Sequence, residues 1–246
     1  MNILITGGNT LIPIDKVRGI TNIFRGRTAC NIAAEGLKRG HDVTLLGNPG
    51  MEQGVCYVDE EKGEARGAFF APYKTYDELY AMMERRITHN NYDCIIHSAA
   101  VSDYKVVKVT GCRPEKKIGP APDHPGKDQY EKTTDYDVDK SGKISSNYEK
   151  MYLELVPTAK IVDKIRNPWG FKGTLVKFKL QVDMTDDELL VIARQSRVAS
   201  DADIIVANCL EWSRERAYIV TDVQNINVQR AELATELLDH IEAIQK

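Results

Sequence analysis

The chain begins with a short apolar segment that ends in two glycines. Asn2–Thr6 reads NILIT, and Gly7 and Gly8 follow it directly. A buried strand of a parallel sheet is a nearly continuous apolar run, and glycine allows the tight turn that must follow it. Helical apolar spacing then covers Thr28–Arg39, and a second apolar run covers His41–Leu46. This order of strand, loop, helix and strand predicts the opening unit of a doubly wound α/β fold.

The same alternation continues toward the end of the chain. Apolar spacing predicts further helices over Tyr76–Thr88, Ala159–Arg166, Asp186–Ser196 and Ala231–Gln245. Apolar runs predict further strands over Tyr92–Ala100, Thr174–Val182, Ala202–Ala207 and Arg216–Thr221. The 246 residues are enough to bury a core without disulfides or metals. We therefore expect one domain over residues 1–246, with a Rossmann-like, doubly wound and mostly parallel sheet.

One long segment interrupts this alternation. From about residue 106 to residue 146 the chain is rich in Lys, Asp, Gly and Pro and has few large apolar residues. Such a composition is typical of a mobile functional loop or a disordered segment. We expect a long flexible flap here, with the elements on both sides completing one sheet.

Charge and cysteine spacing exclude several classes of function. The formal net charge is −3, which gives no electrostatic reason to expect nucleic acid as a partner. No apolar run approaches the roughly 20 residues of a membrane span, and the opening residues lack the pattern of a secretory signal. The five cysteines are scattered and form no C-x-x-C pair, which argues against a disulfide framework and a zinc site. We expect a cytoplasmic protein that does not bind membranes and has no metal-ligand set of its own.

Candidate ligand-binding residues follow the predicted strands, because open α/β sheets bind ligands at the carboxyl ends of their strands. Ala100 lies in a run of small residues that allows a ligand to approach the backbone. Asp103 follows it and could accept hydrogen bonds from a sugar hydroxyl, hold a cation, or simply cap a helix. Gly7 and Gly8 lack the full G-x-G-x-x-G spacing, which counts against a dinucleotide site.

Three arginines gather just before the first predicted helix. Arg18, Arg25 and Arg27 provide fixed cations near a helix N-terminus, an arrangement that suits a phosphate or carboxylate ligand. A solvated basic loop has the same composition. Both interpretations remain open on the residues alone.

Three ordered motifs carry a family resemblance. They are IDKVRGITN at Ile14–Asn22, AAVSDY at Ala99–Tyr104 and KISS at Lys143–Ser146. With them the chain resembles the phosphopantothenate–cysteine ligases of coenzyme A biosynthesis, especially the stand-alone bacterial form, from Met1 to its last residue. The resemblance implies a carbon–nitrogen ligase that uses CTP or ATP with Mg²⁺. Pyrophosphate leaves as 4′-phosphopantothenate becomes an acyl-nucleotide, which the amine of cysteine then attacks. It also implies a homodimer.

The resemblance further implies roles for single residues. It assigns catalytic roles to Asn22, which contacts the acyl intermediate, to Arg18 of the same loop, and to Lys143 of the flap. It assigns the nucleotide site to Ala100, Asp103, Ala159, Lys160, Ile161 and Phe178. It assigns substrate contacts to Arg25, Gly26, Arg27 and Asn208.

The chain departs from the family pattern at three ligand-contacting segments. Phe24–Arg27 stands where the family usually has Ser-Ser-Gly or Ser-Thr-Gly, so two hydroxyls are replaced by two guanidinium groups. Cys209 replaces an aspartate, and Arg194 or Arg197 replaces lysines that contact the triphosphate. Arginine binds phosphate in a bidentate fashion, so phosphate binding could survive by other means.

Two other functions stay open on these observations. A diverged paralogue would ligate another carboxylate to an amine, or only bind a nucleotide. A short-chain dehydrogenase-like oxidoreductase would use Tyr104 and Lys108, because a Tyr-x-x-x-Lys pair can act as a proton donor and its activator. That enzyme class, however, places the pair on a later long helix.

Overall fold

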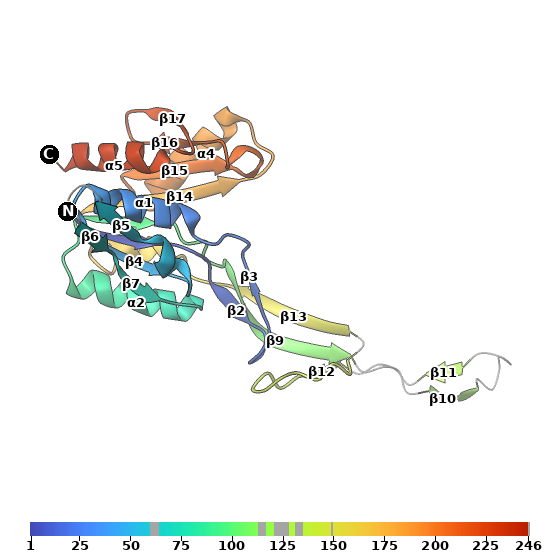
Figure 1. Cartoon of the computed structure of the whole chain (residues 1–246). Coiled ribbons are helices and arrows are strands. Elements are labelled where there is room, and N and C mark those ends of the chain that lie inside the picture. Colours follow the sequence, from blue (N-terminus) through green and yellow to red (C-terminus); the bar gives the residue numbers. More distant parts are fainter. Residues whose placement is uncertain (60–63, 113–116, 121–127, 131–134, 149, 246) are drawn as a thin grey trace. The chain divides into compact units, whose positions relative to one another are not determined.

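The computed structural model describes residues 1–245 apart from 60–63, 113–116, 121–127, 131–134 and 149 (Figure 1). The described chain divides into two units. Unit 1 comprises Met1–Thr10, Asn22–Val101 and Lys160–Lys246, and unit 2 comprises Leu11–Thr21 and Ser102–Ala159. Within the described residues, no helix is long and apolar enough to cross a membrane.

Unit 1 is built on one large sheet. Its strands are β1 (Asn2–Thr6), β4 (Asp42–Gly47), β7 (Phe69–Pro72), β8 (Cys94–His97), β14 (Thr174–Gln181), β15 (Ile204–Cys209), β16 (Arg216–Val220) and β17 (Asn225–Gln229). They lie in the order β17-β16-β15-β14-β8-β1-β4-β7. The pairs from β7 to β15 are parallel, and β16 and β17 add antiparallel strands. The predicted Rossmann-like, mostly parallel fold is confirmed. Strand β8 pairs directly with β14, although most of the residues between them in the sequence belong to unit 2.

Helices cover both faces of this sheet. They are α1 (Arg27–Lys38), α2 (Tyr76–His89), α3 (Val162–Arg166), α4 (Asp186–Ala199) and α5 (Leu233–Ile244), with short 3₁₀ turns at Met51–Gly54 and Leu210–Trp212. Successive side chains of a strand point to opposite faces. Accordingly, Ile3 and Ile5 pack with the apolar residues of α1 and α5, while Leu4 packs with those of α2 and α3. Figure 1 shows α1 beside α5, and Arg39, the C-cap residue of α1, binds Asp239 of α5 at 2.6 Å.

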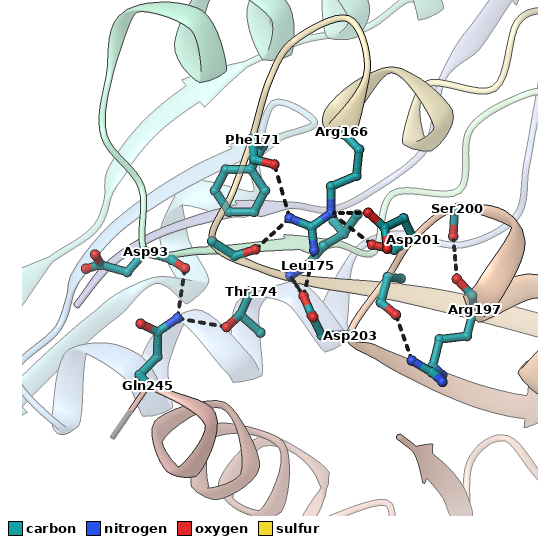
Figure 2. Close-up of polar contacts among 12 residues, drawn as sticks. Asp93, Arg166, Phe171, Thr174, Leu175, Arg197, Ser200, Asp201, Asp203 and Gln245 are labelled. Carbon is teal, nitrogen blue, oxygen red and sulfur yellow. Dashed lines mark hydrogen bonds and ion pairs between the residues drawn. The ribbon is translucent and has the colours of Figure 1, made fainter. Parts of the chain in front are cut away.

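A polar network fixes the start of β14 and β15 against α3 (Figure 2). The guanidinium of Arg166 donates to Asp203 Oδ2 at 2.7 Å and to the carbonyl of Gly173 at 2.7 Å. The same carboxylate oxygen of Asp203 accepts from the backbone N–H of Leu175 at 2.7 Å. Because the guanidinium group is planar and rigid, binding a carboxylate and a carbonyl together fixes the position of these two groups relative to each other. The network therefore sets where β14 begins and how α3 lies on the sheet.

Smaller sheets complete the two units. In unit 1, β5 (Cys56–Asp59) pairs with β6 (Glu64–Gly67). Unit 2 contains β2 (Leu11–Pro13), β3 (Gly19–Thr21), β9 (Tyr104–Cys112), β10 (Lys117–Pro120), β11 (Asp128–Tyr130), β12 (Asp135–Asp137) and β13 (Lys150–Pro157). They form the sheets β2-β3, β10-β11 and β12-β9-β13.

Unit 2 has more regular structure than its composition predicts. Residues 106–146 were expected to form a long flexible flap, yet β9 pairs with β13 along its whole length. Val106, Val109 and Ile144 form a small buried core, to which Ile12 and Leu153 contribute from other segments. No single segment supplies enough apolar residues to show a core pattern. That the segment moves as a flap stays a prediction, and part of it lies outside the described residues.

Candidate functional site

The ends of β1, β4 and β8 and the loops that follow them are hydrogen-bonded to one another. The N–H of Gly7 donates to the carbonyl of Leu46 at 2.8 Å, and the N–H of Ala100 donates to the carbonyl of Gly8 at 2.8 Å. Asn9 and Ala100 form a parallel bridge beyond the strand ends. The carboxyl edge of the parallel sheet is therefore one connected backbone surface, where such folds bind ligands.

Two glycines bring the start of α1 against the turn after β1. Gly8 and Gly26 have positive φ angles of 88° and 79°, which favour glycine. A Cβ at Gly26 would lie 2.6 Å from the backbone N of Gly8, and a Cβ at Gly8 would lie 2.1 Å from Oδ1 of Asn48. Glycine at both positions allows the N-terminus of α1 to approach the turn.

Three asparagines connect these loops. Asn48 accepts a hydrogen bond from the N–H of Asn9 at 2.7 Å and donates to its carbonyl at 2.8 Å. The side-chain amide of Asn9 donates to the carbonyls of Asn22 and Phe24 at 2.8 and 2.7 Å. The side-chain amide of Asn22 donates to the carbonyl of Ala100 at 3.0 Å. The structure thus brings the predicted site residues Asn22 and Ala100 together.

Asn9 and Asn48 were missed by the sequence analysis. Each follows a predicted strand closely, Asn9 after Gly7 and Gly8 and Asn48 after the run that ends at Leu46. The rule that ligands bind beyond strand ends would have singled out both residues.

The N-terminus of α1 is rich in positive charge. Gly26 is its N-cap residue, no side chain caps it, and its first turn contains no acidic residue. The predicted residues Arg25 and Arg27 flank Gly26 and are exposed. Free N–H groups and the helix dipole favour an anion at such an end.

Arg230 adds a cation to this end of α1. Its Nη2 donates to the hydroxyl oxygen of Thr28, and its Nη1 is buried with no hydrogen-bond partner among the described residues. Burial lowers the pKa of Arg230 below its usual range. Arg230 lies 202 positions from Thr28 in the chain, so no local pattern could have revealed this contact.

Two predicted residues lie on the face of the sheet that α1 covers. Phe178 of β14 is half-buried against the core that includes Ile3 and Ile5. Asn208 of β15 lies two positions beyond Val206, the register partner of Phe178, and so shares its face. Asn208 is buried, and its Oδ1 has no hydrogen-bond partner among the described residues. An unpaired buried acceptor is costly, which makes Asn208 a candidate to receive a ligand donor.

Lys160 and Ile161 immediately precede α3. Lys160 is exposed, whereas Ile161 is 1% exposed and packs in the core on the opposite face, with Leu79 and Ile165. A ligand could therefore contact Ile161 only through its backbone.

The remaining predicted residues lie in unit 2. Asp103 is exposed, and its carbonyl accepts the N–H of Thr158 at 2.8 Å, one residue before Ala159. Arg18 binds Asp15 at 2.6 Å through Nη2 and also contacts the carbonyl of Ile144. Lys143 is exposed and directly precedes Ile144. The structure thus brings Arg18 next to the segment that carries Lys143.

A buried histidine lies just inside the carboxyl edge of the sheet. Nδ1 of His97 and the hydroxyl of Thr6 are 2.8 Å apart and buried. Burial, with a smaller contribution from the charge of Lys177, lowers the pKa of His97 to about 4. Because the ordinary value is about 6.5, His97 is neutral in the folded protein at neutral pH.

This histidine predicts a pH dependence of stability. Below about pH 6.5 the histidine of the unfolded chain is protonated, whereas His97 of the folded protein stays neutral down to about pH 4. The free energy of unfolding should fall by about 3 kcal/mol across that interval, since one pKa unit corresponds to about 1.4 kcal/mol. Denaturant unfolding at several pH values, compared between wild type and His97→Gln, measures the contribution of His97 to the pH dependence of the free energy of unfolding. Equal pH dependence in both proteins would contradict it.

The dehydrogenase interpretation is wrong in its geometry. Tyr104 and Lys108 both lie in the strand β9, and Lys108 Nζ binds Asp137 Oδ1 at 2.7 Å. Residues four apart in a strand are separated by about 13 Å, whereas the same spacing on a helix makes them neighbours. The pair therefore cannot act as a proton donor and its activator.

Several known proteins have similar sequences. A family model for the C-terminal domain of DNA/pantothenate metabolism flavoproteins matches residues 1–121. The coenzyme A biosynthesis bifunctional protein CoaBC of Thermococcus kodakarensis is 28% identical over 248 residues, which cover 98% of this chain and 50% of that protein. The chain spans about half the length of the curated relatives it matches.

Solved structures agree with this result. The crystal structure of the DNA/pantothenate metabolism flavoprotein from Streptococcus pneumoniae is 30% identical, with a TM-score of 0.75 over 99% of both chains. A Cab2 mutant in complex with phosphopantothenate-cysteine has a TM-score of 0.66 at 17% identity, over 98% of this chain and 85% of that one, which shows a shared fold. The resemblance found in the sequence motifs is confirmed. The chain belongs to the family of the C-terminal domain of DNA/pantothenate metabolism flavoproteins.

Proposed function

We propose that this chain ligates 4′-phosphopantothenate to cysteine in coenzyme A biosynthesis and is a nucleotide-dependent carbon–nitrogen ligase. The names of its relatives support this, since the curated ones are coenzyme A biosynthesis proteins. The Cab2 structure of the same fold contains phosphopantothenate-cysteine, the product such a reaction would form. The single observation that carries the proposal is the connected site of Asn22, Ala100 and the α1 N-terminus at the carboxyl edge of the sheet.

The reaction has two steps. The carboxylate of the acid attacks the α-phosphorus of the nucleotide, and pyrophosphate leaves. The amine of cysteine then attacks the carbonyl carbon of the acyl-nucleotide, and the nucleoside monophosphate departs. Activation is necessary because a carboxylate offers only oxide as a leaving group. The enzyme must hold two anionic partners together and neutralise the charge that develops between them.

Residues of unit 1 suit the acyl group and the nucleotide. The side-chain amide of Asn22 is a neutral donor, held at 3.0 Å from the carbonyl of Ala100. Ala100 leaves room for a ligand against the backbone. Phe178 offers an aromatic edge for a base, and Asn208 offers an unpaired acceptor. We assign Lys160 and the backbone of Ile161 to the nucleotide as well.

Residues of unit 2 complete the proposed assignments. Asp103 would accept hydrogen bonds from the ribose, and Ala159 would line the nucleotide. Lys143 would stabilise the charge on the phosphates during acyl transfer.

The nucleotide is CTP or ATP, and we propose that Mg²⁺ enters as its complex with the triphosphate. Among the residues that the structure describes, no group of three or more His, Cys, Asp or Glu side chains could hold a metal ion. Mg²⁺ in triphosphate sites usually keeps phosphate oxygens and water as ligands, with one or two carboxylates. When bound, it would neutralise charge on the phosphates.

The arginines at the start of α1 bind the phosphate of the acid in this proposal. Arg25 and Arg27 stand where related ligases have hydroxyl residues, and guanidinium groups bind phosphate in a bidentate fashion. Arg25→Ala and Arg230→Ala should each raise the KM for 4′-phosphopantothenate about tenfold, the effect of losing one charged hydrogen bond. The KM for the nucleotide should change little. Steady-state kinetics measures both values, with Arg39→Gln, at the other end of α1, as the control.

The substituted turn also motivates a second candidate. Phe24–Arg27 lacks the hydroxyl residues of the related ligases, and a paralogue that activates another carboxylate would carry such a change. Pyrophosphate release should be measured with CTP and ATP, with and without cysteine, on 4′-phosphopantothenate and on pantothenate. A strong preference for the phosphorylated acid that Arg25→Ala removes supports the ligase. Nucleotide binding without activation of either acid favours the paralogue.

We also propose that the protein is a cytoplasmic homodimer that acts on small molecules and binds neither nucleic acid nor membranes. Family resemblance motivates the dimer. Sedimentation at micromolar concentration should show twice the mass of the 27.7 kDa chain. A monomer under these conditions would contradict this part of the proposal and leave the reaction itself untouched.

A further inference from the structure

Asp15 is a buried carboxylate that organises a tight turn in unit 2. Its Oδ1 accepts the backbone N–H groups of Val17 and Arg18 at 2.8 and 2.7 Å. Its Oδ2 accepts Nε and Nη2 of Arg18 at 3.0 and 2.6 Å. The Asp15 side chain is 0% exposed, whereas that of Arg18 is 43% exposed. Carboxylate and guanidinium thus form a fork-to-fork pair of fixed geometry.

The same pair holds both backbone groups of Ile144, 126 positions away from Arg18. The N–H of Ile144 donates to Asp15 Oδ2 at 3.0 Å, and Arg18 Nη2 donates to the carbonyl of Ile144 at 2.8 Å. Ile144 is 2% exposed and lies in the core of unit 2. Position 144 is therefore fixed by two backbone hydrogen bonds and by burial.

The residue on the other side of Lys143 is fixed as well. The carbonyl of Gly142 accepts the N–H of Lys16 at 3.2 Å. The backbone of Lys143 is thus tied to the Asp15 turn at both neighbours, while its side chain is exposed. A long flexible side chain on a fixed backbone presents its ammonium group within a limited volume.

We propose that Asp15 and Arg18 are positioning residues that hold Lys143 for the ligation, a role that rests on the proposed function. Arg18 then acts through its contacts with Asp15 and Ile144 and does not need to touch the substrate. The hydrogen bonds from Arg18 also hold the pKa of the Asp15 carboxyl well below its usual range, with backbone N–H groups contributing. The carboxyl group of Asp15 therefore stays ionised throughout the neutral pH range.

Asp15→Asn tests the pair with little change in volume. Placed at Oδ2, an amide NH₂ would face the N–H of Ile144 and the guanidinium of Arg18, which are all donors. The amide of Ile144 should lose protection against hydrogen exchange. The kcat for pyrophosphate release should fall about tenfold or more, because a displacement of about 1 Å can cost up to a hundredfold. The KM for the nucleotide should stay within about twofold.

A double-mutant cycle separates positioning from direct contact or general damage. If Asp15 acts through Lys143, adding Asp15→Asn to Lys143→Ala should change the residual kcat by less than about twofold. Arg18→Gln should give the same result when it is combined with Lys143→Ala. It provides a second variant if Asp15→Asn folds poorly. Lys108→Gln removes another ion pair of unit 2, with Asp137, and should leave kcat unchanged in both backgrounds.

The outcomes are distinct. Equal losses with and without Lys143 would overturn the positioning role, and so would full activity of Asp15→Asn in the wild-type background. A wild-type protein that releases no pyrophosphate with any nucleotide would overturn the proposed function itself, before any variant is compared.

Discussion

Replacing Lys143 by alanine should lower the turnover of the ligation about a hundredfold while the protein remains folded. Loss of one charged contact to a transition state costs on the order of 3 kcal/mol, which corresponds to that factor. The Lys143 side chain is exposed and contributes nothing to the core of unit 2, so the free energy of unfolding should change by less than about 0.5 kcal/mol. Pyrophosphate release at saturating substrates, together with a denaturant titration, measures both quantities.

A neighbouring lysine provides the control for this experiment. Lys150 at the start of β13 is also exposed and lies in the same unit. Lys150→Ala removes the same charge from unit 2, and we expect its turnover to stay within about twofold of wild type. Unchanged turnover of Lys143→Ala would remove Lys143 from the mechanism. Similar losses in both variants would indicate a general effect of net charge.

Replacing Asn22 by aspartate should slow the transfer to cysteine about a hundredfold and slow activation of the acid much less. The change places a negative charge beside an anionic acyl phosphate, where a neutral donor is needed. It also places a carboxylate oxygen near the carbonyl of Ala100, which now accepts the Asn22 amide at 3.0 Å. A burst of pyrophosphate release followed by slow product formation would be the kinetic sign of this variant.

The matched control for Asn22 lies at the end of α2. The side-chain amide of Asn90 donates to the carbonyl of Arg86 at 2.9 Å, the same kind of contact away from the carboxyl edge of the sheet. Asn90→Asp should lose stability comparably and keep both half-reactions intact. Equal slowing of activation and transfer in Asn22→Asp would argue against a role at the acyl intermediate. It would point instead to disruption of the contact with Ala100.

The alternation of strands and helices was predictable because each element carries its own pattern. Asn2–Thr6 carries three consecutive buried apolar residues, Ile3 to Ile5, and the helical spacing of α1 places Ala29, Ile32 and Leu37 on one face. The strands of unit 2 were harder to predict. Val106 and Val109 of β9 pack with Ile12 and Leu153, which lie far from them in the chain. A core assembled from distant segments leaves no strong period in any one of them.

The order of apolar runs and helical patterns was enough to predict the fold class, and short motifs with their flanking turn nominated Asn22, Ala100, Gly26 and Lys143. Which side chains contact one another became known from the folded chain. Asn22 reaches Ala100 across 78 positions, Arg230 reaches Thr28 across 202, and Arg18 reaches Ile144 across 126. The propensity to form a helix or a strand depends on neighbours within a few residues, so it can be predicted from the sequence. Contacts between distant polar groups depend on where the whole sheet and its loops place them, and no local pattern carries that information.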